Sequence, residues 1–230
     1  EYIRRLGYLM RSDVGTDSES FLLFVSQFAT NPDGEIWPSE TGAITKWFAR
    51  GAPISGEFNG YPYSNLHSML LNRVTPAATH KPGSKPPPTG FTGKATQDGF
   101  AALPRLDYAS AGFKLTGAWS RVFSIPADVP AFPPTPKRGA LPMTWQRQLM
   151  SVKDDDPDGV SYIILRDTVG GKQPTQWRFW TLSEKIGAAS EAPGRKILGP
   201  RELKGDRFTA VGQFGVDLEY YIASPAGGPR

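Results

Sequence analysis

The sequence has no cysteine and only two histidines, His67 and His80. The lack of cysteine excludes disulfide bonds, thiolate nucleophiles and cysteine-ligated zinc together. A transition-metal site would need the two histidines to be joined by carboxylates such as Asp107 or Glu57, and neither spacing is typical of a metal motif. We therefore predict no bound metal and no other cofactor, with a divalent metal as the minor alternative.

Long apolar runs are also missing. No stretch approaches the length of about 18 apolar residues that a membrane-spanning helix needs, and no basic-then-apolar start of a signal peptide is present. The chain begins at Glu1 rather than at Met, which favours a processed chain or, more readily, a piece of a larger one. The formal net charge is only +4, with basic residues scattered among acidic ones, so no nucleic-acid partner is predicted. An anionic polysaccharide carries charge of the same sign as a nucleic acid and is the other class of partner that a basic chain can bind.

Glycine and proline, by contrast, are abundant, with 25 Gly and 22 Pro in 230 residues. Glycine and proline at this frequency interrupt helices and favour short strands and irregular loops. We predict an all-β protein with roughly ten to thirteen strands and little helix, folded as one antiparallel β-sandwich of two packed sheets over residues 1–230. The Pro-rich segments 75–93 and 126–142 are predicted to be surface loops or insertions.

The clearest local pattern covers residues 145–182, where TWQRQLMSVKDDDPDGVSYIILRDTV runs on to TQWRFWTL. Residues 160–169 are β-branched and aliphatic, as suits a strand, and Asp158-Gly159 is a typical hairpin turn. Gly170-Gly171 repeats that turn signal one strand later. This pattern predicts a three-stranded antiparallel meander.

The acidic turn in this region also matches the first half of a calcium loop, with Asp154, Asp156 and Asp158 before Gly159. The position of the bidentate glutamate holds Leu165 instead, so the pattern favours a hairpin tip, with weak surface calcium binding as the alternative.

Two further hairpin or strand signals lie in the first half of the chain. Residues 43–50 and 52–58 are predicted to pair around Gly51. Residues 66–74 can alternate as a strand that places His67 and Arg73 on one face.

Aromatic and basic residues each allow two interpretations. Trp37, Tyr61 and Tyr63 fall in polar segments, where large exposed rings are typical of a glycan cleft, whereas the aromatic residues within strands are predicted to pack the core. Several arginines can offer a bidentate fork to a carboxylate or sulfate, or can cover a sheet face with their apolar stems. These arginines are Arg73, Arg121, Arg147, Arg166 and Arg178.

Four blocks of sequence resemble a known family when they are taken in order. They are FATNPDG...WPSETGAITKWFARGAPISGEF, HSMLLNRV, RLDYASA and the meander that opens with W-x-R-Q-L. Together they resemble the carboxy-terminal β-sandwich of heparinase II/III-like polysaccharide lyases, over about residues 21–224. In that family the sandwich follows a large α/α toroid, and the active site lies in the cleft between the two domains. The toroid usually carries a catalytic Tyr and Asn, while the sandwich contributes a His and, in some members, metal ligands.

The resemblance implies β-elimination on an acidic, uronate-containing polysaccharide. His67 matches the catalytic histidine of the sandwich, although Ser68 follows it where the family often has Asn. Asn72 and Arg73 would bind substrate at the mouth of the cleft, together with the aromatic residues of the polar segments. The chain would then be secreted or periplasmic, partnered by an upstream helical domain or neighbouring subunits, and inactive alone.

A second interpretation keeps the scaffold without its chemistry. Because a fold does not by itself fix a function, the chain is alternatively a non-catalytic sandwich of an extracellular protein that binds glycan or assembles with other subunits.

Overall fold

The computed structural model describes residues 1–3, 6–26, 41–56, 72, 74–76, 90–119, 143–156, 159–171, 175–186 and 206–223. Within these ranges the chain forms strands β1 to β14 and no helix, and every strand pairing is antiparallel. The predicted all-β class is therefore confirmed. In the part of the chain so described, no helix has the length and apolarity needed to cross a membrane.

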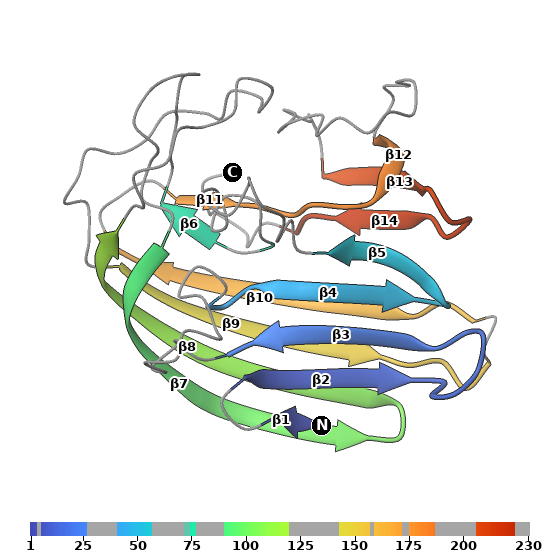
Figure 1. Cartoon of the computed structure of the whole chain (residues 1–230), viewed down its shortest axis with the longest axis horizontal. Coiled ribbons are helices and arrows are strands. Elements are labelled where there is room, and N and C mark those ends of the chain that lie inside the picture. Colours follow the sequence, from blue (N-terminus) through green and yellow to red (C-terminus); the bar gives the residue numbers. More distant parts are fainter. Residues whose placement is uncertain are drawn as a thin grey trace.

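The first five strands form one sheet in sequence order (Figure 1). They are β1 (Tyr2–Ile3), β2 (Gly7–Ser12), β3 (Ser20–Val25), β4 (Ile44–Ala49) and β5 (Ala52–Gly56). The β4–β5 hairpin turns through Arg50 and Gly51, whose φ angles of 52° and 73° fit a two-residue turn with both central residues at positive φ. The predicted hairpin around Gly51 is confirmed.

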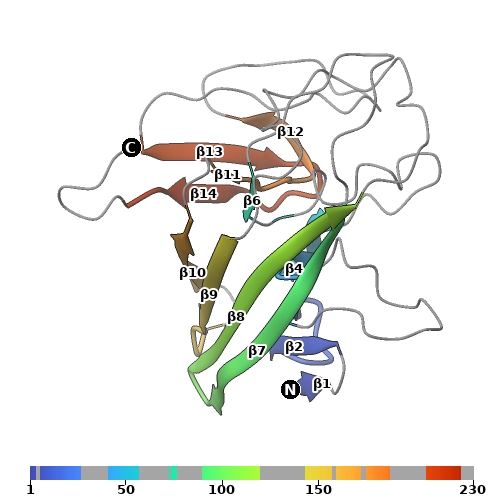
Figure 2. The same ribbon diagram turned by 90° about the vertical axis from the view of Figure 1, so that its left-hand side faces the viewer.

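A four-stranded sheet in the order β10-β9-β8-β7 lies behind the first sheet (Figure 1). Its strands are β7 (Gly90–Leu103), β8 (Leu106–Trp119), β9 (Met143–Val152) and β10 (Tyr162–Gly170). Two smaller sheets complete the fold, and Figure 2 shows them beyond one end of the β7–β8 hairpin. One pairs β6 (Val74–Pro76) with β11 (Thr175–Trp177), and the other has the order β12 (Ser183–Ile186), β13 (Arg207–Gly212), β14 (Leu218–Tyr221).

The two large sheets pack face to face over one hydrophobic core. Rings meet across the interface, with Tyr8 stacked on Phe100 at 5.2 Å between centroids and Phe24 edge-on to Phe113 at 6.5 Å. Alternation along β9 turns four side chains into this core, and they are Met143, Trp145, Arg147 and Leu149. A charged arginine thus occupies a position that the pattern gives to apolar residues.

The meander prediction is correct for its first two strands and wrong for its third. β9 and β10 pair in register from Tyr162↔Val152 to Gly170↔Thr144, but β11 pairs with β6 instead of β10. Trp177 is the residue opposite Val74 in that pairing, and it is 43% exposed rather than packed in the core. The TQW sequence does form a strand, but its partner, β6, comes from a distant part of the chain.

The first Pro-rich segment differs at both ends from its prediction. Residues 75–76 belong to β6 and residues 90–93 to β7, so both ends of the predicted loop 75–93 are strand; residues 77–89 and the segment 126–142 lie outside the described residues. β7 was not predicted over its length, because KATQDGFAAL has little apolar alternation. Its long pairing with the more regular β8 accounts for it.

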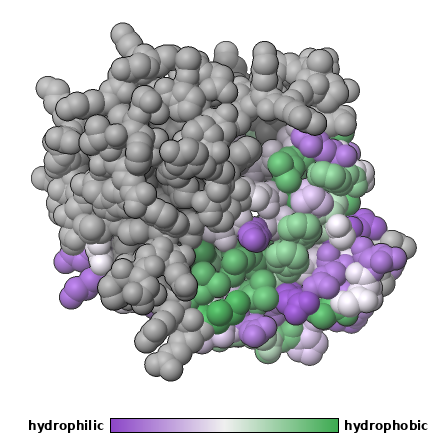
Figure 3. Space-filling view, viewed as in Figure 1, coloured by the Kyte–Doolittle hydropathy of each residue, from purple (hydrophilic) through white to green (hydrophobic). Residues whose placement is uncertain are grey.

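The outer side of the five-stranded sheet is unusually apolar for a surface. Figure 3 shows apolar area on this side, beside hydrophilic residues at the sheet ends. Phe21 and Phe48 stack here at 4.6 Å, next to half-buried Leu9 and Leu23.

Candidate functional site

Of the six residues predicted to form the site, the structure describes only Asn72. The others are Trp37, Tyr61, Tyr63, His67 and Arg73, which lie outside the described residues. Asn72 is only 2% exposed and belongs to a buried polar cluster between the two large sheets. This cluster, made by Gly42, Ser55, Asn72, Trp145, Arg147, Asp167 and Trp180, is called the arginine cluster below.

The centre of the cluster is an ion pair between neighbouring strands. Arg147 on β9 and Asp167 on β10 are direct partners in the antiparallel register, so both side chains point to the same face of the sheet. Nε and Nη2 of Arg147 each donate to one carboxylate oxygen of Asp167 at 2.8 Å. The arginine side chain is 0% exposed and that of the aspartate 10%, so this is a desolvated, bidentate pair.

Trp145 completes the environment of the pair from the same strand. Its Nε1 donates to Oδ1 of Asp167 at 2.7 Å, and the guanidinium carbon of Arg147 lies 4.7 Å from the indole centroid. The carboxylate therefore receives donors from two side chains, while the cation lies over an aromatic face. A buried ion pair is tolerated when its lone pairs and protons are satisfied in this way.

The remaining nitrogen of Arg147 reaches two distant parts of the backbone. Nη1 donates to the carbonyl oxygen of Gly42 at 2.9 Å and to that of Asn72 at 2.7 Å. The same Asn72 oxygen accepts the amide of Ile44 at 3.1 Å. One guanidinium thus joins strand β9 to Gly42, two residues before β4, and to Asn72, two residues before β6.

The carboxamide of Asn72 is turned into the protein. Nδ2 donates to Oγ of Ser55 at 2.5 Å, and Oδ1 accepts the backbone amide of Trp180. Ser55 in turn donates to the carbonyl of Trp180 at 2.6 Å. These bonds give Asn72 a structural task, holding β5 and the Trp180 segment together, whereas its contact with substrate stays a prediction.

Gly42 fits the cluster because it lacks a side chain. Its φ is +76°, and a Cβ at this position would overlap the six-membered ring of Trp145. The Gly42 amide donates to the carbonyl of Val25 at 2.8 Å, so the residue is tied on both sides.

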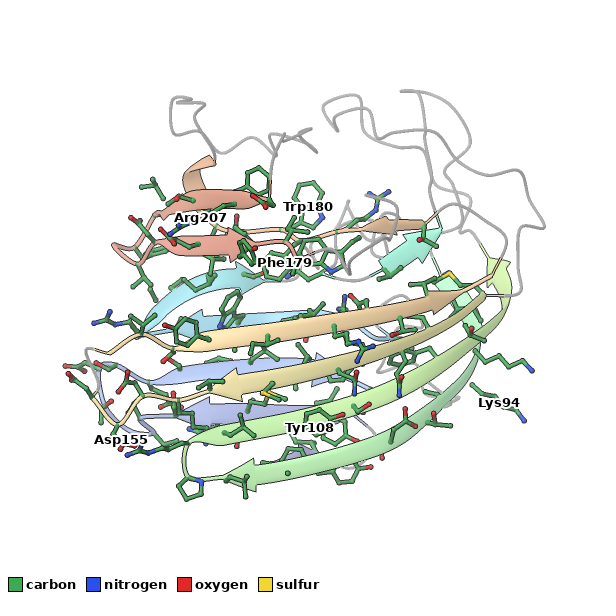
Figure 4. All side chains as sticks on the ribbon, turned by 180° about the vertical axis from the view of Figure 1, so that it is seen from behind. Lys94, Tyr108, Asp155, Phe179, Trp180 and Arg207 are labelled. Atoms are coloured by element: carbon green, nitrogen blue, oxygen red, sulfur yellow. The ribbon has the colours of Figure 1, made fainter. Side chains whose placement is uncertain are left out.

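An aromatic group adjoins the cluster on the extended segment between β11 and β12, where Figure 4 labels Phe179 and Trp180. Phe179 stacks on Trp177 at 5.5 Å and meets Trp47 and Tyr220 edge-on at 5.8 and 5.4 Å. Burial raises the pKa of the Tyr220 hydroxyl, although a hydrogen bond with Thr181 opposes this.

Arg178 lies between these rings in sequence and is 8% exposed. Burial lowers the pKa of its guanidinium to about 10, because desolvation disfavours the charged form. Arg178 also has an interaction partner within the protein.

A second buried charged residue, Asp107, lies at the start of β8, where β9 ends. Asp107 accepts from Nζ of Lys153 at 2.9 Å and from the amide of Arg11 at 3.3 Å through its Oδ2 atom. Its Oδ1 atom is buried and has no hydrogen-bond partner among the described residues. This pair closes the end of the sandwich near the β7–β8 turn.

Metal binding finds no support in the described part of the chain, where no group of three or more His, Asp or Glu side chains could hold an ion. In the acidic turn, Oδ1 of Asp154 accepts the amide of Asp156 at 3.1 Å, and the Gly159 amide donates to the carbonyl of Asp156 at 2.8 Å. These local bonds fit the hairpin-tip interpretation; Asp158 lies outside the described residues.

The sequence singled out Arg147 only as one of five arginines, and it did not single out Gly42 or Asp167. The available signal was the position of Arg147 on the inward face of β9, between Trp145 and Leu149. An arginine on an otherwise apolar face predicts a buried partner, and the adjacent strand offered Asp167.

The chain was compared with protein-family models, with curated proteins and with solved structures, and none of the three comparisons gave a match.

Proposed function

We propose that this chain is the β-sandwich part of a polysaccharide lyase, which cleaves uronate-containing polysaccharide by β-elimination together with a helical domain. A base would remove the proton on the carbon beside the carboxylate, and the glycosidic oxygen would leave with a proton from an acid as the ring double bond forms. The sandwich would be secreted or periplasmic and would contribute one wall of the cleft.

The observation that carries this proposal is the meeting of the resembling sequence blocks at one point. Gly42 comes from the first block, Asn72 from HSMLLNRV and Arg147 from W-x-R-Q-L, and the guanidinium bonds to both of the other two. Ala111, at the end of RLDYASA, is the partner of Arg147 on β8. The four blocks resemble the family in their order along the chain, and residues from all four lie next to each other in space. This is expected if the blocks contribute to one site.

Each predicted site residue has a definite role in this proposal. His67 is the catalytic histidine of the sandwich. Arg73 pairs with the substrate carboxylate, which gains further negative charge as the enolate forms. Trp37, Tyr61 and Tyr63 offer flat faces to sugar rings. Asn72 acts on the substrate indirectly, because its carboxamide holds the chain beside Arg73.

The test is an ultraviolet assay for unsaturated uronate, using the full natural chain that contains this sequence and a panel of heparin, alginate and hyaluronan. We expect product from at least one polysaccharide, and we expect His67→Ala to reduce kcat by a factor of about 100 or more. Matched Ser68→Ala should keep most of the activity. No product from any member of the panel, with glycan binding retained, would replace this proposal with a non-catalytic sandwich.

A second candidate, an assembly sandwich, is favoured by the apolar outer side of the five-stranded sheet. Phe21, Phe48 and Leu23 are only half-buried there. A face of this kind is typical of a surface that packs against another domain or subunit. A stable assembly without elimination activity would favour this candidate.

A further inference from the structure

Strand β10 forms one edge of the four-stranded sheet (Figure 2). Among the described residues, β9 is its only strand partner, and no backbone hydrogen bond leads from β10 to any other element. Val169 faces the inner side of the sheet, opposite Trp145, but it is 38% exposed, as expected at an edge that no further strand covers. β10 therefore presents a row of free N–H and C=O groups with which another strand can pair.

The other three edges of the two large sheets have features that block such pairing. β1 has only two residues, and β7 has two register shifts and the exposed Lys94. β5 contains Pro53, and the carbonyl oxygen of its Ile54 accepts the amide of Leu182 at 2.8 Å. Short strands, bulges, lysine, proline and covering segments are the usual means by which proteins prevent association through sheet edges. β10 has none of these features: its nine residues, YIILRDTVG, pair with β9 without a register shift.

The outer side of β10 is apolar in its first half. Tyr162 is 57% exposed and Ile164 is 54% exposed. Each begins an apolar row that continues across the outer face of the sheet, which Figure 4 shows from behind. The rows are Tyr162, Val152 and Leu106, and Ile164, Met150 and Tyr108. An apolar surface beside a free edge is typical of a contact with another protein.

We propose that β10 is the interface of a two-fold symmetric dimer, in which the β10 strands of two copies pair antiparallel and join the two four-stranded sheets into one continuous sheet. The inference uses only β10 and its neighbours, so it does not depend on the proposed lyase function. The pairing uses the free edge of both copies, and the other edges of the large sheets are blocked. Assembly therefore stops at the dimer and does not continue to a filament.

The charged residues of β10 limit how two copies can match. In a two-fold antiparallel pair, the residue on the axis lies opposite itself. An axis at Arg166 or at Asp167 would place like charges directly opposite each other, which destabilises a strand pair. An axis at Leu165 would place the apolar Ile163 opposite Asp167 of the second copy. These three arrangements are therefore unfavourable.

An axis at Ile164 gives a favourable match on both faces of the strand. On the outer face, Ile164 lies opposite its own copy, and Tyr162 lies opposite Arg166 of the second copy, where a guanidinium can stack on the ring. Symmetry makes this contact twice. On the inner face, Ile163 lies opposite Leu165 of the second copy, and both are apolar residues that pack against the core. The strand is thus complementary to itself, which favours a second copy over an unrelated partner.

The first test is the mass of the full natural chain that contains this sequence, measured by sedimentation velocity over a range of concentrations. We expect a dimer whose Kd rises by a factor of about ten or more in Ile164→Lys, because two ammonium groups would then face each other on the axis. Ile164 is exposed in the single chain, so this substitution should leave the fold intact. Thr168→Lys is the matched control, because it adds the same charge to the same face of β10 at a distance from the axis. It should change Kd by a factor of about two or less.

A cross-link tests the register. These 230 residues contain no cysteine, so Ile164→Cys adds a single thiol to them. Opposite Cβ atoms of an antiparallel pair lie about 5 Å apart, close to the range of a disulfide, so mild oxidation should join the two copies covalently. In the control Thr168→Cys, each thiol lies opposite position 160 of the second copy, about eight residues and 27 Å from the other thiol. This variant should stay uncross-linked, as should the parent chain treated in parallel.

Three outcomes would overturn the inference. The first is a parent chain that stays monomeric at high micromolar concentration. The second is a dimer that Ile164→Lys leaves intact, because such a dimer would form through another surface, for example the apolar outer side of the five-stranded sheet. The third is cross-linking that is absent in Ile164→Cys or equal in the two cysteine variants. None of these measurements depends on elimination activity, so a failure of the lyase proposal would leave this inference standing.

Discussion

Gly42 lies directly against the indole ring of Trp145, at a φ of +76°, so that a Cβ at this position would overlap the ring. Two independent conditions therefore hold at Gly42. Its backbone conformation disfavours any L side chain, and its surroundings leave no room for one. Gly15 has a similar φ of +82° but nothing within 4 Å of the position of a Cβ.

This contrast makes a matched pair of variants. Gly15→Ala should lower the free energy of unfolding by about 1 kcal/mol, because only the left-handed conformation is penalised. Gly42→Ala should cost about 3 kcal/mol, since overpacking against Trp145 adds to the same penalty. Urea unfolding measures both, and equal losses would show that the Trp145 contact has no energetic consequence.

The bonds between Asn72 and Ser55 predict strong coupling. Asn72→Ala leaves the partly buried Trp180 amide without its acceptor and Ser55 without its donor, and it should cost about 3 kcal/mol. Ser55→Ala removes a bond of the same network. The double variant should therefore cost less than the sum of the single losses by about 1 kcal/mol, as a double-mutant cycle would measure. Additive losses would mean that the two residues act separately.

Much of the sandwich follows from local patterns in the sequence. The hairpin at Arg50-Gly51 and the β9–β10 pair were predictable, because turn chemistry and alternation act within a few residues. β7 was not predictable in the same way. Its sequence carries little alternation, and its strand conformation depends on the partner that β8 supplies.

The site shows the same limit more sharply. The sequence identifies Asn72 as polar and Arg147 as basic, but their meeting spans 75 positions of the chain. Long-range pairing is decided by packing rather than by propensity, as the pairing of β11 with β6 also shows. An inward arginine is a local signal for some buried partner, and only the fold shows which carbonyls it binds.

For the buried ion pair between Asp107 and Lys153, we expect the removal of one charge to cost more than the removal of both. Lys153→Met leaves the Asp107 carboxylate buried without its cation and should cost about 3 kcal/mol. The double variant Asp107→Asn/Lys153→Met removes both charges and should recover most of that loss. Arg105 of the β7–β8 turn and Asp155 of the β9–β10 connection form an exposed pair nearby, so Arg105→Met is the control, with an expected change of about 0.5 kcal/mol or less. A large loss in the control, or none in Lys153→Met, would contradict this prediction.

Alkaline stability should depend on Tyr220. Burial, the main cause, raises the pKa of its hydroxyl above the ordinary value of 10.0, so above that pH the unfolded chain loses a proton that the folded chain keeps. The contribution of Tyr220 is therefore fully present below pH 10 and declines as the pH rises toward its folded pKa, by at most about 1.4 kcal/mol per pH unit. Arg178 acts in the opposite direction, because its pKa is lowered to about 10 and the folded chain releases its proton first.

Comparison of Tyr220→Phe with the parent isolates the tyrosine, since Arg178 is present in both. The variant should lose about 1 kcal/mol near neutral pH with its hydrogen bond to Thr181, and it should fall less steeply than the parent between about pH 10 and pH 11.5. Urea unfolding over this range measures the two slopes. Tyr221→Phe is the control, because Tyr221 is 73% exposed and its loss should leave the slope unchanged. Parallel curves for Tyr220→Phe and the parent would mean that the Tyr220 hydroxyl reaches water in the folded chain, and that the aromatic group around Phe179 is open rather than closed.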